Sequence, residues 1–221
     1  MRHQQQKTRG LISMNGNSDR ARARIARARA IISDDDARSV YAEWATTYDR
    51  DVFSTLKVTG TNMIADLLHE HTADIQAARV LDAGCGTGAV AARLKLHGFD
   101  LIDGVDLSPD MLKLAKAKNL YRTLIEANLN KSFELPHTPY TAIVSAGTFT
   151  TGHVGADGFR NLFDHLEQHG LMACVIASPV WQRDRFDMLV GKLPADVLSN
   201  QVEATIPGGE PDAHMLVLRR N

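Results

Sequence analysis

Apolar residues along the chain recur with two different periods. In Ala37–Tyr48 and in Thr61–Glu70 they return every three or four positions, which predicts two amphipathic helices. After these segments, short apolar runs typical of strands alternate with further helical segments. The predicted strands are Arg79–Ala83, Leu101–Asp106, Leu124–Ala127, Thr141–Ser145, Leu171–Ala177, Gln201–Ile206 and Met215–Leu218. The predicted helices between them are Val90–Leu96, Pro109–Lys118, Phe159–Glu167 and Arg185–Leu193.

The order of these elements predicts the fold class. Strands that alternate with helices indicate a mostly parallel sheet that is covered on both faces. The last two predicted strands are joined by Pro207, Gly208 and Gly209, and so short a connection joins only antiparallel neighbours. We therefore expect one α/β domain with a Rossmann-like, doubly wound, seven-stranded sheet. The sheet is mostly parallel with an antiparallel C-terminal strand, and helices cover both faces.

Positive charge is concentrated at the N-terminus. Residues 1–30 carry eight basic side chains and one acidic side chain. The whole chain has 25 basic and 26 acidic residues, so residues 31–221 carry 17 basic and 25 acidic residues and are acidic overall. We expect residues 1–33 to form a basic arm, flexible or helical, and residues 34–221 to form the domain. An acidic domain repels a phosphate backbone, so nucleic acid is not an expected partner beyond nonspecific contact by Arg20–Arg29.

Hydropathy and cysteine content narrow the class of protein further. No run of eighteen or more apolar residues occurs, so we expect no membrane-spanning segment, and no secretory signal is evident. The two cysteines, Cys85 and Cys174, are too few for a disulfide framework and fit a reducing compartment. No group of His, Cys, Asp and Glu has the spacing of metal ligands, so no metal is expected. We expect a cytoplasmic protein, monomeric or homodimeric.

A glycine-rich turn follows the first predicted strand. Residues 80–88 read Val-Leu-Asp-Ala-Gly-Cys-Gly-Thr-Gly, and a helix is predicted directly after them. Glycines at alternate positions let a ligand lie against the backbone without a Cβ in the way. Ligands of open α/β sheets bind at the carboxyl ends of the strands, where this turn lies. The turn therefore predicts a ligand site.

Two classes of ligand fit this turn. Gly84, Gly86 and Ala89 satisfy the dinucleotide fingerprint, and Asp106 follows about twenty residues later, as that fingerprint requires. Asp82 favours a different ligand, because a carboxylate just before the turn suits a cationic amino group and repels a pyrophosphate. The chain after the fifth strand is also too short for a second mononucleotide-binding half. An NAD-type oxidoreductase is therefore the lesser alternative.

Several runs resemble the class I S-adenosylmethionine-dependent methyltransferases. The runs that match their strand and loop motifs are Val80–Gly88, Gly104–Leu112, Glu126–Leu129 and Ala142–Gly147. The helix Tyr41–Asp49 resembles the N-terminal lid of these enzymes, so the resemblance implies lid helices within residues 34–75. Together with Ala146–Val154, this helix further resembles the Williams–Beuren-region methyltransferase-like proteins.

The resemblance implies a set of cofactor contacts. Asp106 would accept hydrogen bonds from both ribose hydroxyls, Asp82 would lie close to the ammonium group, and Asn128 would bind near the adenine amino group. Met111 would pack against the adenine, with an ordinary place in the core as the alternative. The other implied cofactor-binding residues are Tyr48, Gly84, Cys85, Gly86, Leu107, Leu129 and Ser145.

The residues after the fourth predicted strand lie where a methyl acceptor would bind. His153 titrates near neutral pH, so it is the candidate general base; the alternative is a loop histidine that hydrogen-bonds the backbone. Thr148 would orient the substrate or satisfy loop backbone groups. Tyr41, Trp44 and Trp181 are further candidates for the acceptor pocket, with a place in the core as the alternative for the two tryptophans.

The function expected from these features is methyl transfer by in-line displacement. S-adenosylmethionine would be the donor, S-adenosylhomocysteine the product, and a small, partly apolar molecule the acceptor. A small acceptor is favoured because no inserted substrate domain follows the fifth predicted strand. The alternative outside the enzymes is a module that binds S-adenosylmethionine or S-adenosylhomocysteine without turnover.

Overall fold

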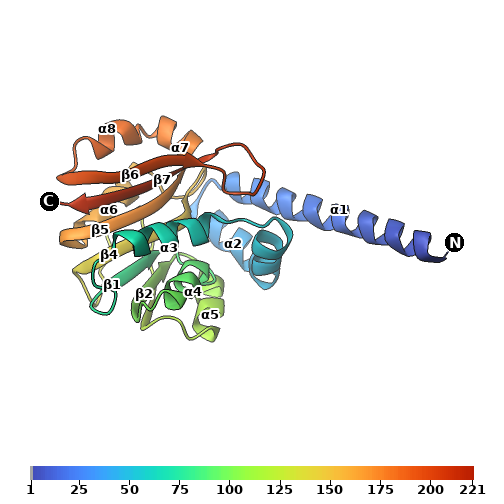
Figure 1. Ribbon diagram of the computed structural model, residues 1–221, viewed down its shortest axis with the longest axis horizontal. Coiled ribbons are helices and arrows are strands. Elements are labelled where there is room, and N and C mark those ends of the chain that lie inside the picture. The colour runs from blue at the N-terminus through green and yellow to red at the C-terminus, as the bar shows by residue number, and fades with distance from the viewer. Residues whose placement is uncertain (1) are drawn as a thin grey trace.

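The computed structural model describes the backbone of residues 2–221 and the side chains of residues 16–221. A seven-stranded sheet lies between helices, and the long N-terminal helix extends away from it (Figure 1). The strands are β1 (Arg79–Ala83), β2 (Leu101–Asp106), β3 (Thr123–Glu126), β4 (Tyr140–Phe149), β5 (Leu166–Ala177), β6 (Ala195–Glu203) and β7 (Ala213–Arg220). The helices are α1 (Arg2–Arg29), α2 (Asp34–Trp44), α3 (Gly60–His71), α4 (Ala89–Leu96), α5 (Pro109–Ala117), α6 (Ala156–Asp164), α7 (Ser178–Arg183) and α8 (Phe186–Val190), with a 3₁₀ turn η1 (Ala45–Thr47) and a π-helical turn η2 (Arg50–Thr55).

The order of the strands is β3-β2-β1-β4-β5-β7-β6. β1 pairs in parallel with β2 and β4, β2 with β3, and β4 with β5. β7 runs antiparallel to both of its neighbours, β5 and β6. This arrangement confirms the predicted mostly parallel sheet with an antiparallel C-terminal strand. It also brings the carboxyl ends of β1, β2 and β4 together at one edge of the sheet.

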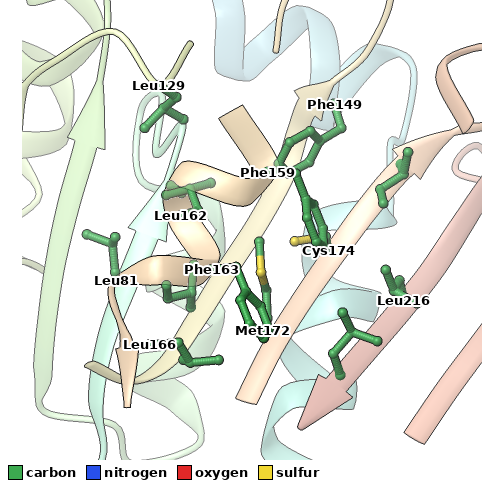
Figure 2. Packing of buried hydrophobic residues seen from close by; sticks show 14 of the residues in the cluster. Leu81, Leu129, Phe149, Phe159, Leu162, Phe163, Leu166, Met172, Cys174 and Leu216 are labelled. Atoms are coloured by element: carbon green, nitrogen blue, oxygen red, sulfur yellow. The ribbon is translucent and has the colours of Figure 1, made fainter. Parts of the chain in front are cut away.

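Apolar side chains cover both faces of the sheet. On one face, Phe159 and Leu162 of α6 pack with Met172 of β5 and other buried residues (Figure 2). On the opposite face, Ile64 of α3 and Leu94 of α4 are fully buried against the strands. Because the sheet is buried on both sides, its strand ends hold the connecting loops in fixed positions.

Side-chain caps determine where two helices next to the strand ends begin. Ser108 accepts a hydrogen bond from the Met111 backbone N–H at 3.3 Å, and Pro109 occupies the first turn of α5, as predicted. Ser33 caps α2 in the same way, with the Asp36 N–H 3.1 Å from its Oγ. The two serine caps therefore determine the residues at which α2 and α5 begin.

Several predicted elements have different bounds in the structure; the predicted helix Phe159–Glu167, for example, ends at Asp164 because β5 already begins at Leu166. The predicted helix Arg185–Leu193 is observed as the shorter α8, and an additional helix, α7, begins beside Pro179 and is separated from α8 by Arg185, which has a φ of 53°. The predicted strand Gln201–Ile206 is observed as β6, which begins earlier, at Ala195. β6 is the edge strand and most of its side chains are at least partly exposed, so no apolar run marks its start.

The last turns of α1 pack on α2 and η2. Arg24 forms an ion pair with Asp51 of η2, and Arg27 pairs with Asp36 of α2. The side chains of residues 1–15, the first part of the predicted basic arm, lie outside the described residues. Within the part of the chain that the structure describes, no helix combines the length and the apolar character that a membrane crossing requires.

Replacing Phe159 with Ala should strongly destabilise the fold. The Phe159 ring is fully buried, with its centroid 5.5 Å from that of Phe149 and 5.3 Å from that of Phe186. Removing it leaves a cavity, so we expect a loss of about 3–5 kcal/mol in the free energy of unfolding by urea denaturation. The exposed neighbour Arg160→Ala is the control and should change stability by less than about 0.5 kcal/mol. A Phe159→Ala loss below about 1 kcal/mol would contradict this packing.

Candidate functional site

A cavity of about 380 Å³ lies at the carboxyl ends of β1, β2 and β4. Its volume is in the range of cofactor and small-molecule sites. Its wall joins elements that are far apart in the sequence: the segment before α2, the turn after β1, the end of β2 and the loop after β4. The predicted site residues that line it are Tyr41, Tyr48, Gly84, Gly86, Asp106, Leu107, Met111, Asn128, Leu129, Thr148 and His153.

The glycine turn after β1 is held by backbone hydrogen bonds to the end of β2. The N–H groups of Gly84 and Cys85 donate to the Val105 carbonyl oxygen at 2.8 and 3.0 Å. Gly84 and Gly86 adopt φ values of 70° and 52°, which favour glycine. A Cβ on Gly84 would lie 2.0 Å from the Thr148 hydroxyl, whereas a Cβ on Gly86 would meet no atom within 4 Å. The turn therefore presents bare backbone to the cavity.

Asp106 is the carboxylate in the wall beside this turn. Its Oδ2 accepts from the Gly86 N–H at 2.8 Å, and its Oδ1 accepts from the Ser108 N–H at 2.8 Å. Burial raises the pKa of Asp106 above its ordinary value, and these backbone hydrogen bonds oppose that rise. Its charge is thus held by backbone N–H groups and not by a cationic side chain, which suits a carboxylate that receives a ligand's hydroxyl groups.

Asp82 lies behind the turn and does not line the cavity. The side chain is fully buried; its Oδ2 accepts from the Tyr121 hydroxyl at 2.7 Å, and its Oδ1 has no hydrogen-bond partner among the described residues. Burial raises the pKa of Asp82 to about 7, the Tyr121 hydrogen bond lowers it, and the nearby Asp106 carboxylate raises it. A buried carboxylate, Asp82, and a half-buried one, Asp106, have no basic partner among the described residues, which makes this region favourable for a cation.

Three other predicted residues line neither this cavity nor the second one described below. Cys85 and Ser145 are buried, and the Ser145 hydroxyl donates to the Ala83 carbonyl oxygen at 2.7 Å. Trp181 stacks on His214 with ring centroids 3.9 Å apart and lines neither this cavity nor the second one described below. Because these three residues are not on a cavity wall, their positions do not support the predicted contacts with cofactor or acceptor.

The far end of the cavity combines apolar and polar groups. Leu107 and Met111 supply apolar surface. The Asn128 amide donates to Asp34 at 2.7 Å, and its oxygen accepts from the Asn130 N–H at 2.9 Å. The Asp34 carboxylate therefore reaches the same end of the cavity as Asn128.

A second cavity of about 150 Å³ adjoins the first. Tyr41, Tyr48, Ala146, Gly147 and His153 line both cavities. Most of the remaining wall is apolar; it includes the predicted acceptor residue Trp44 together with Ile25, Ala28, Val52, Phe53, Val58, Val175 and Ala177.

Tyr41 and His153 form a hydrogen-bonded pair at the boundary of the two cavities. The Tyr41 hydroxyl lies 2.7 Å from His153 Nε2, and His153 Nδ1 lies 3.0 Å from both the Thr151 carbonyl oxygen and the Thr150 hydroxyl oxygen. In the tautomer whose Nδ1–H donates to the Thr151 carbonyl oxygen, Nε2 accepts from the Tyr41 hydroxyl. Burial lowers the pKa of His153, so its ring is neutral at neutral pH. The ring thus both hydrogen-bonds the backbone and presents a basic nitrogen.

Sequence reasoning missed part of the cavity wall. Ile31 and Ile32, in the connection between α1 and α2, and Asp34, the first residue of α2, line it, and the position of this segment depends on the ion pairs of α1. One local signal was available, because Ser33 before three aspartates is a strong helix-start pattern. The other lining residues that were not singled out are Ser33, Ala37, Ser108, Ala127, Asn130, Ala146, Gly147, Gly152 and Val154, of which the last four lie in the segment after the fourth predicted strand, where the acceptor was expected.

Comparison with known proteins identifies the type of domain. Residues 80–170 match the family model of a methyltransferase domain. The chain is 32% identical over 162 residues to human Methyltransferase-like protein 27, covering 72% of this chain and 65% of that protein. It is 28% identical over 130 residues to the malonyl-[acyl-carrier protein] O-methyltransferase of Bacillus cereus, covering 58% of this chain and 47% of that protein. The chain thus spans less than two thirds of the length of both relatives.

Solved structures show the same fold. Magnesium protoporphyrin IX methyltransferase from Synechocystis PCC 6803 with bound S-adenosylmethionine superposes with a TM-score of 0.68 at 14% identity, covering 87% of this chain and 99% of that chain. A TehB-like S-adenosylmethionine-dependent methyltransferase from Corynebacterium glutamicum has a TM-score of 0.63 at 20% identity, covering 83% of this chain and 100% of that chain.

The matched model is that of a methyltransferase domain, and the fold is shared with solved S-adenosylmethionine-dependent methyltransferases, in agreement with the class predicted from the sequence. The chain also resembles Methyltransferase-like protein 27, in agreement with the predicted likeness to the Williams–Beuren-region proteins.

Asp82→Asn should remove a pH dependence of stability. With a pKa of about 7 in the folded state and about 4 when unfolded, Asp82 is protonated only in the folded state between these values, so stability falls as pH rises from about 4 to about 7. Asparagine cannot ionise, so as pH rises across this range the free energy of unfolding of the variant should increase by roughly 2–4 kcal/mol relative to that of the wild type. Urea denaturation without cofactor at pH 5, 6, 7 and 8 measures this difference. The exposed Asp110→Asn variant is the control. If the free energies of unfolding of the wild type and of Asp82→Asn change with pH in parallel, the raised pKa of Asp82 is refuted.

Proposed function

We propose that this chain transfers the methyl group of S-adenosylmethionine to a small-molecule acceptor, with S-adenosylhomocysteine as the product. The observation that carries the proposal is the position of Asp106, which lies in the wall of the larger cavity beside the bare backbone of Gly84 and Gly86. A carboxylate held by backbone N–H groups suits a ribose, and bare backbone next to it accommodates the adjoining part of a nucleoside.

The charge of the site supports this cofactor over a dinucleotide. S-adenosylmethionine has a net positive charge, whereas the pyrophosphate of a dinucleotide is negative. Asp82 and Asp106 lie on either side of the glycine turn, and neither is paired with a basic side chain of the described residues. A pyrophosphate would meet repulsion from both carboxylates, whereas a sulfonium and an ammonium group would be attracted.

The lining residues fit the parts of this cofactor in order. Gly84 and Gly86 would receive the methionine portion, and Asp106 the ribose hydroxyls. Leu107 and Met111 would pack against the adenine ring. The list of proposed cofactor contacts is completed by Tyr48, Leu129 and the adjacent polar pair Asn128 and Asp34.

Asp82 would act from behind the turn. Its unpartnered Oδ1 and its raised pKa are features of a carboxyl group that becomes ionised when positive charge is bound nearby. In this proposal Asp82 is an electrostatic partner of the cofactor's ammonium group, with no contact of its own to the cavity.

The acceptor would bind next to the shared wall of the two cavities. Bound S-adenosylmethionine supplies an activated methyl group, so the protein's main task is to align the acceptor with it and to exclude water. The Bacillus cereus relative is named as an O-methyltransferase, and we take an oxygen as the attacking atom. As the oxygen–methyl bond forms and the sulfur–methyl bond breaks, His153 Nε2 takes the hydroxyl proton, directly or through the Tyr41 hydroxyl bonded to it.

Asp106→Asn should weaken binding of S-adenosylmethionine by about 10- to 100-fold, because neutral hydrogen bonds replace charge-assisted ones to the ribose. Isothermal titration calorimetry measures the dissociation constant. The matched control is Asp110→Asn, an exposed carboxylate on the next helix, which should leave affinity unchanged. Unaltered affinity in Asp106→Asn would refute the ribose assignment.

His153→Ala should lower kcat by at least about 100-fold and change the dissociation constant of S-adenosylmethionine by less than about threefold. The wild-type rate should fall as pH drops through the His153 pKa, which lies below its ordinary value, because the protonated ring cannot accept a proton. Initial rates of S-adenosylhomocysteine formation, measured with a panel of small hydroxyl acceptors, test both points. Equal turnover in the variant would assign His153 to loop structure alone.

A further inference from the structure

The second cavity has the size of a single ring. Its volume of about 150 Å³ matches that of an engineered protein cavity that binds benzene. The aromatic side chains of its wall include those of Tyr41, Trp44, Tyr48 and Phe53, with the Trp44 and Tyr48 ring centroids 4.7 Å apart. Its boundary with the larger cavity carries the Tyr41–His153 pair. An apolar ring in this cavity would therefore lie beside a hydroxyl and a basic nitrogen.

Two charged residues belong to the wall of this cavity, Arg29 and Asp212. Both carboxylate oxygens of Asp212 accept from the Thr205 hydroxyl at 2.9 Å, and Oδ1 also accepts from the Thr205 N–H at 2.8 Å. Arg29 has no hydrogen bond or ion pair with any of the described residues, unlike Arg24 and Arg27 of the same helix. The cavity thus has one cationic group that is available to a ligand.

Packing fixes the backbone of Arg29 at this place. Ala28 beside it is 5% exposed and belongs to the cluster around Trp44. Gly152 approaches the same turn so closely that a Cβ there would lie 3.2 Å from the Arg29 carbonyl oxygen and 2.8 Å from that of Ile31. The arginine is therefore held against the loop that carries His153, although its side chain is exposed.

We infer that the second cavity binds a monocyclic acceptor that carries a carboxylate and a hydroxyl group. This inference rests on the proposed methyl transfer. Arg29 binds the carboxylate, the apolar wall holds the ring, and the hydroxyl lies at the boundary with Tyr41 and His153. The two groups have different roles: the Arg29 guanidinium recognises the acceptor, and the basic nitrogen of His153 receives its proton.

Matched probes test this selectivity. Protein saturated with S-adenosylhomocysteine is titrated with 4-hydroxybenzoate and with 4-hydroxybenzamide, which differ in the charge of one group. The carboxylate should bind about tenfold more tightly, as expected for one charge-assisted hydrogen bond at a partly solvated site. Equal affinities, or no binding by either probe, would overturn the inference.

Variants of α1 assign the selectivity to one residue. Arg29→Gln should weaken the binding of 4-hydroxybenzoate by about tenfold and change the affinity for 4-hydroxybenzamide by less than about twofold. Arg29→Lys should keep part of the preference for the carboxylate. The control is Arg22→Gln, an exposed arginine of α1 that lines neither cavity. A preference that persists in Arg29→Gln would contradict the role of Arg29.

The two tryptophans of the chain report where the probe binds. With 5-fluorotryptophan at Trp44 and Trp181, the carboxylate probe should shift the ¹⁹F resonance of Trp44, which lines the cavity, and not that of Trp181. A shift of Trp181 alone would overturn the location. Binding of S-adenosylhomocysteine is measured first: its absence contradicts the proposed function, and with it the inference, whereas its presence without carboxylate preference contradicts the inference alone.

Discussion

The site depends on the contact between the turn after β1 and the end of β2. The Gly84 and Cys85 N–H groups donate to the Val105 carbonyl oxygen, and the Gly86 N–H donates to Asp106. These bonds form only because both glycines adopt positive φ, and a side chain at Gly84 would overlap Thr148. The shape of the turn, the orientation of the Asp106 carboxylate and the open space of the cavity are therefore consequences of one parallel strand pair.

The N-terminal helix is connected to the same site through Asp51. This buried carboxylate accepts hydrogen bonds from the Trp44 indole at 3.0 Å, from Thr47 at 3.0 Å and from Arg24. Burial alone would raise the pKa of Asp51, and the hydrogen bonds, that from Arg24 first, lower it overall. The carboxylate thus stays ionised and joins α1, α2 and η2. As a result, the last turn of α1 becomes part of the wall of the second cavity.

Local patterns were sufficient to predict the centre of the fold, and long-range packing explains what they missed. β1 and β2 have the predicted bounds because each is a short apolar run that ends at a carboxylate or turn. Gly84, Gly86 and Asp106 line the cavity as predicted, because parallel strands end at one edge. Asp82 and Ser145 are fully buried within the sheet and do not reach the cavity wall. Ile31 and Arg29 carry no local signal, since the ion pairs of α1 determine their positions.

The central claim is that the larger cavity binds S-adenosylmethionine. Calorimetric titration of the full chain with S-adenosylmethionine, S-adenosylhomocysteine and NAD, under the same conditions, tests it most directly. Binding of the first two with one molecule per chain and no binding of NAD is the predicted result. Binding of NAD alone would contradict the account, because the two unpaired carboxylates beside the glycine turn would then have to tolerate a pyrophosphate.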